Sequence, residues 1–462
     1  METSLLRNKK ISVIGAARSG IGVARLLKQN GALLFVSDQQ DASKLKKSIS
    51  ELQKENIAFE AGKHTERVFD CSLMVLSPGV PSDTPLVLEA KKRGINVVSE
   101  LEVASWFCKA PIVAITGSNG KTTTTTLLGR IFSDAKKKHV VAGNIGEAFS
   151  NFVLDLAETD IVVLEVSSFQ LDFIESFRPA VSVLLNITRN HMDRYGNSME
   201  RYAASKARIF MNQKPDDILI YNADDEWTQS KVKGAKCKAV PFSTARDLRE
   251  GAFVRHGMLT TILNDIEAGI IDVSQISIKG EHNLQNAMAA TLAAQSMGVS
   301  PAYIRSTLKN FKGVEHRQEF VREFNGVKYV NDSKATTVEA VARALGAYGE
   351  PIVLILGGKD KGNDYTQIFD AVKEKVRAIV AVGASAATVV KNFSGLVPLE
   401  RVDTIGSEIP NIASMKKTID TARSLAQRGD LVLLSPACTS FDWFTDFEER
   451  GKVFKAIVNS LE

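Results

Sequence analysis

The sequence predicts an α/β protein with three domains, each built around a mostly parallel sheet. Short apolar runs rich in β-branched residues alternate with segments of helical spacing, which is typical of strand–helix–strand units. Most of these runs end in a polar loop that contains glycine or serine. The 462 residues also suit about three domains of roughly 150 residues each. We expect a Rossmann-like N-terminal unit, a central P-loop-type sheet and a C-terminal Rossmann-like α/β domain.

The composition excludes several classes of protein. The chain is 44% hydrophobic and 24% charged, as expected for globular domains. Its formal net charge of +5 is small for this length, which argues against a dedicated nucleic-acid binder but allows basic phosphate pockets. The four cysteines are widely spaced without a C-x-x-C pair, so neither a disulfide framework nor a zinc motif is expected. We find neither a signal-peptide pattern nor an apolar membrane span, and we expect a cytoplasmic protein.

The first domain, residues 1–108, begins with a pattern typical of nucleotide binding. Residues 10–38 predict a strand, a tight turn, a helix and a second strand that ends at Asp38. The turn resembles the dinucleotide fingerprint, although Ala17 stands at the second glycine position. A later apolar run ends at Ser77 in a Pro-Gly turn, and ligands gather at that edge of a parallel sheet. We expect either a nucleotide site here or a Rossmann-like scaffold whose turn binds no ligand.

The central domain, residues 109–312, contains a glycine loop between a predicted strand, residues 111–116, and a helix. The loop GSNGK is followed by five threonines that open the helix. Such a loop forms an anion cradle, because backbone N–H groups and the helix dipole point at the same place. Lys121 adds a charge, and Thr122 would set its hydroxyl beside a phosphate-bound Mg²⁺ ion. The spacing G-x-x-G-K-T is shorter than the general P-loop pattern, so an ordinary turn is the alternative.

Acidic and imidazole side chains follow two further strands of the central domain. Glu165 ends the run DIVVLE, and His191 and Asp193 follow the next strand. Adjacent parallel strands deliver their ends to one edge, so Glu165 and His191 should converge near the glycine loop, where a carboxylate can hold Mg²⁺. The alternatives are a solvated charge and a histidine satisfied by backbone groups. From the residues alone, we expect Lys206 on the following helix to be an ordinary surface lysine.

The third domain, residues 313–462, offers cations and hydroxyls in the loops after its strands. Arg317 follows an apparent linker and could stabilise charge on a γ-phosphate bound by another domain. The loop GGKDKG provides lysines suited to a carboxylate, and a solvated loop is the alternative. The candidate residues of these loops are Asp332, Lys334, Thr336, Lys359, Lys361, Ser440 and Phe447.

The motifs together resemble those of the Mur ligases of peptidoglycan synthesis. The chain contains, in the family's order, TGSNGKTTT, GNIG, LEVSSFQL, NHMDRY, GEHNLQNAMAA, HRQEF, NDSKATT, GGKDKG and LSPACTSFDWFTDFEERG. The resemblance covers nearly the whole chain, and the short glycine loop is the form that this family uses. NHMDRY and SPACTSFD favour the member that adds D-glutamate, and the D-N-P-R stretch of the member that adds the diamino acid is absent.

The resemblance implies an ATP site with two Mg²⁺ ions. ATP would lie on Gly117, Ser118, Asn119, Gly120, Lys121, Thr122 and Thr123, with Asn283 and Asn286 near the adenine. Arg317 and Asp332 would reach ATP from the third domain. The metal ions would be organised by Thr122, Glu165, His191 and Lys206, with Lys206 N-carbamylated and so turned from a cation into a carboxylate-like ligand. The residues implied as catalytic are Lys121, His191, Lys206 and Arg317.

The resemblance also implies sites for two further substrates. A uridine nucleotide would be bound by the first domain and would extend into the central one, along Arg18, Ser19, Asp38, Ser77, Gly79, Asn144 and His191. D-glutamate would be held by Thr336, Lys361, Ser440 and Phe447.

The implied reaction is ATP-dependent amide synthesis. ATP would phosphorylate the carboxylate of UDP-N-acetylmuramoyl-L-alanine, and the amine of D-glutamate would then displace phosphate from the acyl phosphate. Because water would hydrolyse that intermediate, the third domain should close over it, about hinges at residues 108–111 and 312–316. We expect a monomer whose partners are these small molecules, without nucleic acid or membrane.

Three alternatives stay open at this point. The chain could be another ligase of the same architecture, such as a different Mur ligase or a folylpolyglutamate synthase. It could be a nucleotide-binding switch that hydrolyses ATP without joining substrates. It could also be a dinucleotide-dependent oxidoreductase based on GAARSG, although that function leaves the glycine loop unexplained.

Overall fold

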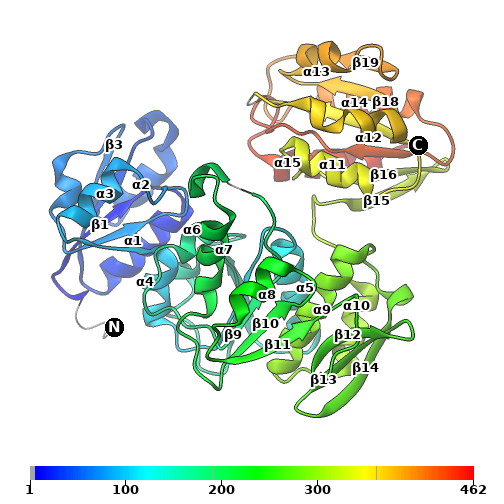
Figure 1. Ribbon diagram of the computed structural model, residues 1–462. Helices are drawn as coiled ribbons and strands as arrows, with labels where there is room; N and C mark the ends of the chain where they lie inside the picture. Colours follow the sequence, from blue (N-terminus) through cyan, green and yellow to red (C-terminus); the bar gives the residue numbers. More distant parts are fainter. Residues whose placement is uncertain (1–5, 191, 361) are drawn as a thin grey trace. The chain divides into compact units, whose positions relative to one another are not determined.

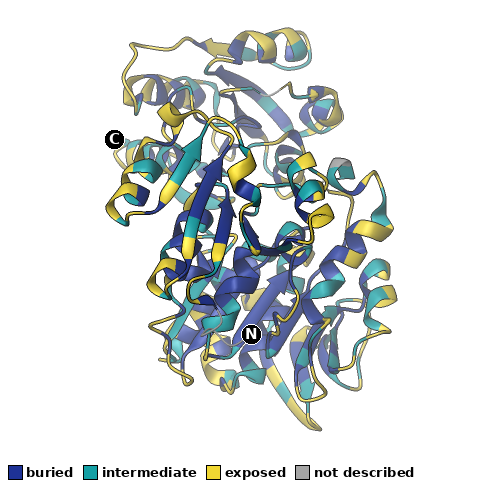
Figure 2. Cartoon of the chain, turned by 90° about the vertical axis from the view of Figure 1, so that its left-hand side faces the viewer, coloured by how far each residue is buried: buried dark blue, intermediate teal, exposed yellow. Residues whose placement is uncertain are grey.

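The computed structural model describes residues 6–190, 192–360 and 362–462 (Figure 1). The chain divides into two compact units, Met1–Phe311 and Lys312–Glu462, and each is described by itself. Figure 2 shows that the strands are largely buried, whereas exposed residues gather on helices and loops. No helix formed by the described residues has both the length and the apolar character needed to cross a bilayer.

The first sheet has five parallel strands in the order β3-β2-β1-β4-β5. Its strands are β1 (Lys10–Ile14), β2 (Leu33–Asp38), β3 (Ala58–Ala61), β4 (Leu73–Leu76) and β5 (Asn96–Ser99). Its helices are α1 (Arg18–Gln29), α2 (Lys46–Lys54), α3 (Pro85–Lys92) and α4 (Glu100–Phe107). The strand order reverses between β1 and β4, and the crevice at such a reversal is where open α/β sheets bind ligands.

The second sheet has nine strands in the order β14-β13-β12-β11-β10-β9-β6-β8-β7. The parallel part comprises β6 (Ile112–Thr116), β7 (His139–Gly143), β8 (Ile161–Glu165), β9 (Val181–Leu184), β10 (Ile218–Asn222), β11 (Lys238–Phe242) and β12 (Gly251–Arg255). Strands β13 (Met258–Leu263) and β14 (Ile266–Asp272) extend it as an antiparallel meander. The principal helices are α5 (Lys121–Asp134), α7 (Met199–Ala207), α8 (Glu226–Val232), α9 (Glu281–Ser296) and α10 (Pro301–Asn310).

Buried carboxylates join the first two sheets into one unit. Glu102 of α4 is fully buried, and its carboxylate accepts the backbone N–H groups of Glu175, Ser176 and Phe177. Glu100 of the same helix accepts the N–H of Ser150 at 2.8 Å. Hydrogen bonds of this kind offset part of the cost of burying a carboxyl group. These contacts explain why the chain from Met1 to Phe311 is a single compact unit.

The second unit contains a six-stranded sheet in the order β15-β16-β20-β17-β18-β19. Its strands are β15 (Glu319–Phe324), β16 (Val327–Asn331), β17 (Ile352–Gly357), β18 (Val376–Val382), β19 (Leu399–Val402) and β20 (Leu431–Leu434), with β15 as an antiparallel edge. The helices are α11 (Val338–Gly346), α12 (Phe369–Lys375), α13 (Ala386–Phe393), α14 (Ile412–Leu425) and α15 (Phe447–Asn459). The expected α/β class with three mostly parallel sheets is confirmed.

Candidate active site

The glycine loop lies between β6 and α5, as the sequence predicts. Gly120 precedes the first residue of α5 with a φ of +83°, and a Cβ at this position would overlap Asn286 Oδ1. Glycine is therefore required here, both for the backbone angle and for the close approach of α9. No side chain of the described chain caps the N-terminus of α5, so its first N–H groups are available to an anion.

Lys121 and two asparagines surround this loop. Lys121 Nζ donates to the carbonyl oxygens of Gly117 at 2.8 Å and Ser118 at 3.1 Å. Asn286 Oδ1 accepts the hydroxyl of Thr124, and its Nδ2 donates to Asn283 Oδ1 at 3.2 Å. The structure thus brings together the residues predicted for ATP from Gly117 to Thr123, with Asn283 and Asn286. The threonines that disfavour the helix on propensity are largely buried and contribute a hydroxyl contact to α9.

Glu165 ends β8 beside the strand that leads into the loop, because β6 and β8 pair in parallel. Its side chain is 3% exposed, and Oε1 accepts the amide of Asn144 at 2.8 Å. Oε2 is buried and has no hydrogen-bond partner among the described residues. A dry carboxylate oxygen of this kind is a site that a cation can satisfy.

Lys206 is not the surface residue that the sequence alone indicates. It lies on α7, is 1% exposed, and donates from Nζ to the carbonyl oxygen of Gly117 at 2.9 Å. Desolvation, aided by the charge of Lys121, lowers the pKa of Lys206 well below its ordinary value, and Asp172 and Glu165 only partly oppose it. Burial therefore shifts the amine toward its neutral, nucleophilic form.

Of two further predicted metal ligands, Thr122 lies within the described residues and His191 does not. Thr122 is the second residue of α5 and is partly exposed beside Lys121. His191, predicted for both the metal and the uridine nucleotide, lies outside the described residues. The described part of the predicted metal site is therefore Thr122, Glu165 and Lys206.

A cavity of about 890 Å³ opens at the carboxyl ends of β1 and β4, where the strand order reverses. The residues predicted for the uridine nucleotide that line it are Arg18, Ser19, Asp38, Ser77, Gly79 and Asn144. Asp38 also fixes the turn, because its carboxylate accepts the N–H groups of Ala16 at 2.7 Å and Gln40 at 2.8 Å. Arg18 donates to the carbonyl oxygen of Gly146 across this cavity.

Sequence reasoning missed His64, which also lines the cavity. Its Nδ1 lies 2.7 Å from Ser37 Oγ, and Ser37 in turn donates to Glu60. Burial lowers the pKa of His64 despite the nearby charges of Glu60 and Asp38. The sequence feature that could have identified His64 was its position in the loop after β3, on the same edge of the sheet as Asp38.

Arg317 and Asp332, predicted to reach ATP, lie close together in the second unit. Arg317 is exposed, whereas Asp332 is 4% exposed at the end of β16. Asp332 accepts the hydroxyl of Ser435 at 2.9 Å and the N–H of Gln318 at 3.1 Å. Burial raises the pKa of Asp332 to about 7, although these hydrogen bonds and the charges of Arg317 and Arg343 oppose the shift.

Of the described residues predicted for D-glutamate, Thr336 and Ser440 lie in loops of the second unit, and Phe447 is the first residue of α15. The Lys334 ammonium lies 5.5 Å from the centre of the Phe447 ring, and Ser333 donates to the Phe447 carbonyl oxygen at 2.8 Å. Ser440, 2% exposed, accepts the N–H groups of Trp443 and Phe444. Lys361 lies outside the described residues.

Sequence reasoning also missed Arg450, which joins these loops. Its guanidinium is 4% exposed and donates to the carbonyl oxygens of Ser333 and Cys438. Burial lowers the pKa of Arg450 to about 10. An arginine with five donors can tie two loops together where a smaller side chain could not.

The fold and the glycine loop define a class, the α/β proteins that receive an anion between a parallel strand and the helix after it. Comparison with known families narrows this class. Residues 115–294 match the Mur ligase middle domain, residues 316–438 match the glutamate ligase domain of Mur ligases, and residues 10–86 match the MurD N-terminal domain.

Whole-chain relatives agree with the domain matches. The chain is 44% identical to the "UDP-N-acetylmuramoylalanine--D-glutamate ligase" of Chloroherpeton thalassium and 43% identical to that of Salinibacter ruber, with 99% of each chain covered. The fold is also similar to that of MurF from Acinetobacter baumannii, with a TM-score of 0.58 at 18% identity over 90% of this chain and 88% of that one. MurC from Thermotoga maritima gives a TM-score of 0.56 at 18% identity over 98% and 100%. The chain belongs to the Mur ligase family.

Proposed function

We propose that the chain is an ATP-dependent ligase that joins the amine of D-glutamate to the carboxylate of UDP-N-acetylmuramoyl-L-alanine and releases ADP and phosphate. Relatives of that name match 99% of the chain. Within the molecule, one observation carries the proposal: Lys121 and Lys206 both donate to the Gly117 carbonyl oxygen, on the edge where Glu165 keeps a buried oxygen that no described residue hydrogen-bonds.

The glycine loop would hold the triphosphate of ATP. The first N–H groups of α5 would bind phosphate oxygens, and Lys121 would turn from the loop carbonyls to the phosphates. Asn283 and Asn286 would lie beside the adenine, and Arg317 and Asp332 would act on ATP from the second unit. Their part would be to position the γ-phosphate and offset the charge that spreads over it during transfer.

The described residues fit a divalent cation at this edge. Glu165 Oε2 is buried without a hydrogen-bond partner in the described part of the chain, and Thr122 follows Lys121 at the head of α5. With His191 and Lys206 they would hold two Mg²⁺ ions, which when bound would offset repulsion between ATP and the acceptor carboxylate. We propose that Lys206 acts as a carbamate: its neutral amine forms an N–C bond with CO₂ and loses one proton, and the product carries a single negative charge shared by two oxygens.

The acceptor would fill the cavity at the reversal between β1 and β4. Arg18, Ser19, Asp38, Ser77 and Gly79 would bind its nucleotide, and Asn144 and His191 would guide the rest of its length toward the loop. Support comes from the placement of Asn144, which lines the cavity and also donates to Glu165. One side chain therefore joins the proposed acceptor site to the proposed metal site.

The acceptor carboxylate would attack the γ-phosphorus of ATP, with ADP as the leaving group. The amine of D-glutamate would then add to the carbonyl carbon of the acyl phosphate, and phosphate would leave as the tetrahedral intermediate collapses. Thr336, Lys361, Ser440 and Phe447 would hold D-glutamate for this attack. A neighbouring cation such as Lys361 suits a carboxylate of the amino acid.

We propose domain boundaries near residues 108 and 312, with hinges at 108–111 and 312–316. The division of the chain after Phe311 supports the second of these boundaries. We further propose a monomer that works in the cytoplasm, where ATP and UDP-linked precursors are present.

Phosphate release tests the proposed function. The purified chain would be given ATP, Mg²⁺ and UDP-N-acetylmuramoyl-L-alanine, with one amino acid at a time from a panel containing D-glutamate, L-glutamate and diaminopimelate. We expect release with D-glutamate alone and formation of the UDP-linked dipeptide by mass spectrometry. Release with another amino acid would indicate a different ligase, and release that is independent of amino acids would indicate an ATPase switch.

A further inference from the structure

The residues around Arg317 form a sharp corner at the start of the second unit. His316 has a φ of +64° and Gln318 a φ of +44°, both in the left-handed region that residues with a Cβ rarely adopt. Such conformations persist only where the surroundings over-determine them. The corner, residues 315–319, therefore needs an explanation in its contacts.

Hydrogen bonds fix the backbone on both sides of Arg317. The N–H of His316 donates to Glu319 Oε2 at 2.9 Å, and that of Gln318 donates to Asp332 at 3.1 Å. The carbonyl oxygen of His316 accepts the N–H of Lys334 at 3.0 Å. The backbone of Arg317 is consequently held between β16 and the carboxylate of Glu319.

The imidazole of His316 anchors the corner in the interior. The residue is 2% exposed, and its Nδ1 accepts from Asn331 Nδ2 at 2.9 Å, so the neutral ring carries its proton on Nε2. A Cβ on Gly451 of α15 would overlap this ring, and Phe447 packs against it edge-on with 6.3 Å between ring centres. Helix α15 thus packs directly on the corner.

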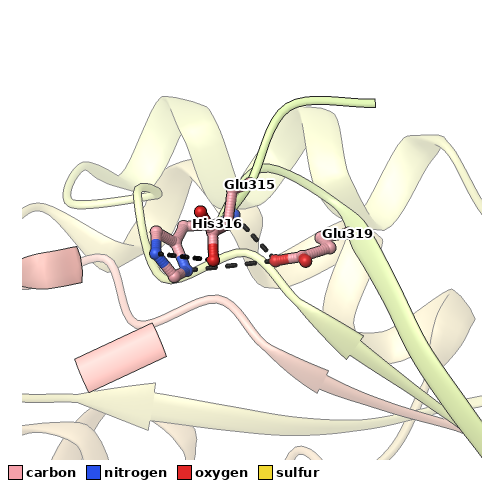
Figure 3. Close-up of side chains that lie close together, drawn as sticks. All are labelled: Glu315, His316 and Glu319. Atoms are coloured by element: carbon pink, nitrogen blue, oxygen red, sulfur yellow. Dashed lines mark hydrogen bonds and ion pairs between the residues drawn. The ribbon is translucent and has the colours of Figure 1, made fainter. Parts of the chain in front are cut away.

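Lys455 of α15 closes the corner from the other side. Its Nζ donates to Glu315 Oε1 at 2.6 Å and to Glu319 Oε1 at 2.8 Å. Figure 3 shows the carboxylates of Glu315 and Glu319 close to the ring of His316, an arrangement that could suit a metal ion. Here the ammonium of Lys455 lies between the two carboxylates, and it is 23% exposed.

We propose that Lys455 is a positioning residue for the proposed ligase reaction: by joining Glu315 to Glu319, it holds the backbone on both sides of Arg317 in one conformation. The inference rests on the proposed function for its catalytic consequence and on geometry alone for its structural part. Loss of the ammonium leaves two carboxylates facing each other beside His316, and their repulsion opens the corner. The backbone around Arg317 then occupies this conformation less often.

Proteolysis tests the structural part without any assay of ligation. Trypsin cleaves after arginine, so the rate of cleavage after Arg317 in the native full-length chain measures how often the corner opens. We expect Lys455→Met to speed this cleavage about tenfold, and Lys455→Arg to restore the wild-type rate to within about twofold. The matched control is Lys328→Met, which removes an ion pair of 2.7 Å to Glu350 elsewhere in the same sheet.

Kinetics tests the catalytic part. For Lys455→Met we expect kcat to fall about tenfold while the KM of the UDP-linked acceptor is unchanged, since Arg317 would act on the transferring phosphate and not on the acceptor. Lys455→Arg should recover most of kcat, and Lys328→Met should retain it. A thermal midpoint close to that of Lys328→Met would exclude general unfolding as the cause.

The outcomes separate the two proposals. A wild-type chain that joins no substrate would end the proposed function but leave the cleavage result standing. Equal cleavage and equal kcat in Lys455→Met and Lys328→Met would overturn the positioning role. Equilibrium dialysis with Zn²⁺ gives a further arm: binding that Glu315→Gln abolishes would make the corner a metal site and would also overturn it.

Discussion

The carboxyl edges of the central sheet and of the second unit's sheet each bury a carboxylate, and the two carboxylates differ in how many of their oxygens have a partner. At the second edge both oxygens of Asp332 are hydrogen-bonded, and in this sense that edge is complete. At the central edge, Lys206 donates to a neutral carbonyl oxygen, and Glu165 has a buried oxygen without a partner among the described residues. At the other edge, Asp332 accepts from Ser435 and Gln318, and Lys455 joins the nearby carboxylates.

The difference lies in what each buried carboxylate contacts among the described residues. Burial moves the pKa of Lys206 down and that of Asp332 up, in each case toward the neutral form. At the central edge this leaves groups that small cations and phosphates can satisfy. At the second edge the carboxylates of Asp332, Glu315 and Glu319 all accept hydrogen bonds and hold the corner beside Arg317, although the buried Nε2 of His316 has no hydrogen-bond partner among the described residues.

Replacing Lys121 should have the largest effect, because it removes the cation from the incomplete edge. For Lys121→Ala we expect ATP turnover to fall by about 10³-fold or more with the fold retained. Phosphate release and near-ultraviolet circular dichroism provide the measurements. A variant with wild-type turnover would contradict the phosphate-binding role of the loop.

Lys206→Ala should have the next largest effect, a fall of about 10³-fold in kcat. Because the proposed carbamate supplies carboxylate oxygens, a small added acid such as acetate should restore part of the rate. Lys236→Ala, at an exposed lysine of the same unit, is the control and should change little. The absence of any rescue would speak against the carbamate.

Asp332→Asn tests the complete edge through the pH dependence of stability. The pKa of Asp332 is about 7 in the folded chain and near 3.8 unfolded, so the folded state binds its proton more tightly. The contribution of Asp332 to the free energy of unfolding of the wild type is therefore largest at low pH and is lost as the pH rises toward 7. Relative to Asp332→Asn, the wild type should lose about 3 kcal/mol of unfolding free energy between pH 5 and pH 8.

Urea unfolding of both chains at several pH values would measure this difference. Parallel curves for the two chains would mean that Asp332 is already ionised at pH 5 and that its burial is offset by Arg317 and Arg343.

Gly120→Ala should give the smallest of these effects on stability, about 2 kcal/mol of destabilisation, with weaker nucleotide binding. The new Cβ would overlap Asn286 at a φ of +83°. Gly234→Ala is the matched control, because no atom lies within 4 Å of its added Cβ. Thermal unfolding with and without ATP would separate the two consequences, and equal midpoints for both variants would show that the loop can relax.

Much of the central edge could be predicted because its signals are local. The loop from Gly117 to Lys121 combines glycines, a lysine and a helix start within a few residues, and Glu165 ends an apolar run. The cavity residues Asp38 and Ser77 were likewise found at strand ends. The roles assigned to ATP, the metal ions and D-glutamate came from the family resemblance and remain predictions.

Contacts between distant segments could not be read from the sequence. Lys206 reaches Gly117 across 89 residues through the packing of α7, and Asn144 meets Glu165 only because β7 pairs with β8 in one particular register. The antiparallel strands β13 and β14 were not expected either, since the pattern of the neighbouring segments is strand–helix–strand. Lys455 is an ordinary helical lysine until α15 packs against residues 315–319.

The two hydrogen bonds of Lys121 have a consequence for how a nucleotide would enter. By donating to the carbonyl oxygens of Gly117 and Ser118, this side chain keeps the loop folded in advance. When a triphosphate binds, Lys121 would exchange these carbonyl oxygens for phosphate oxygens as its acceptors, within a loop that is already folded. Binding of the nucleotide would therefore require little further ordering of the loop, because the loop takes up its conformation when the chain folds.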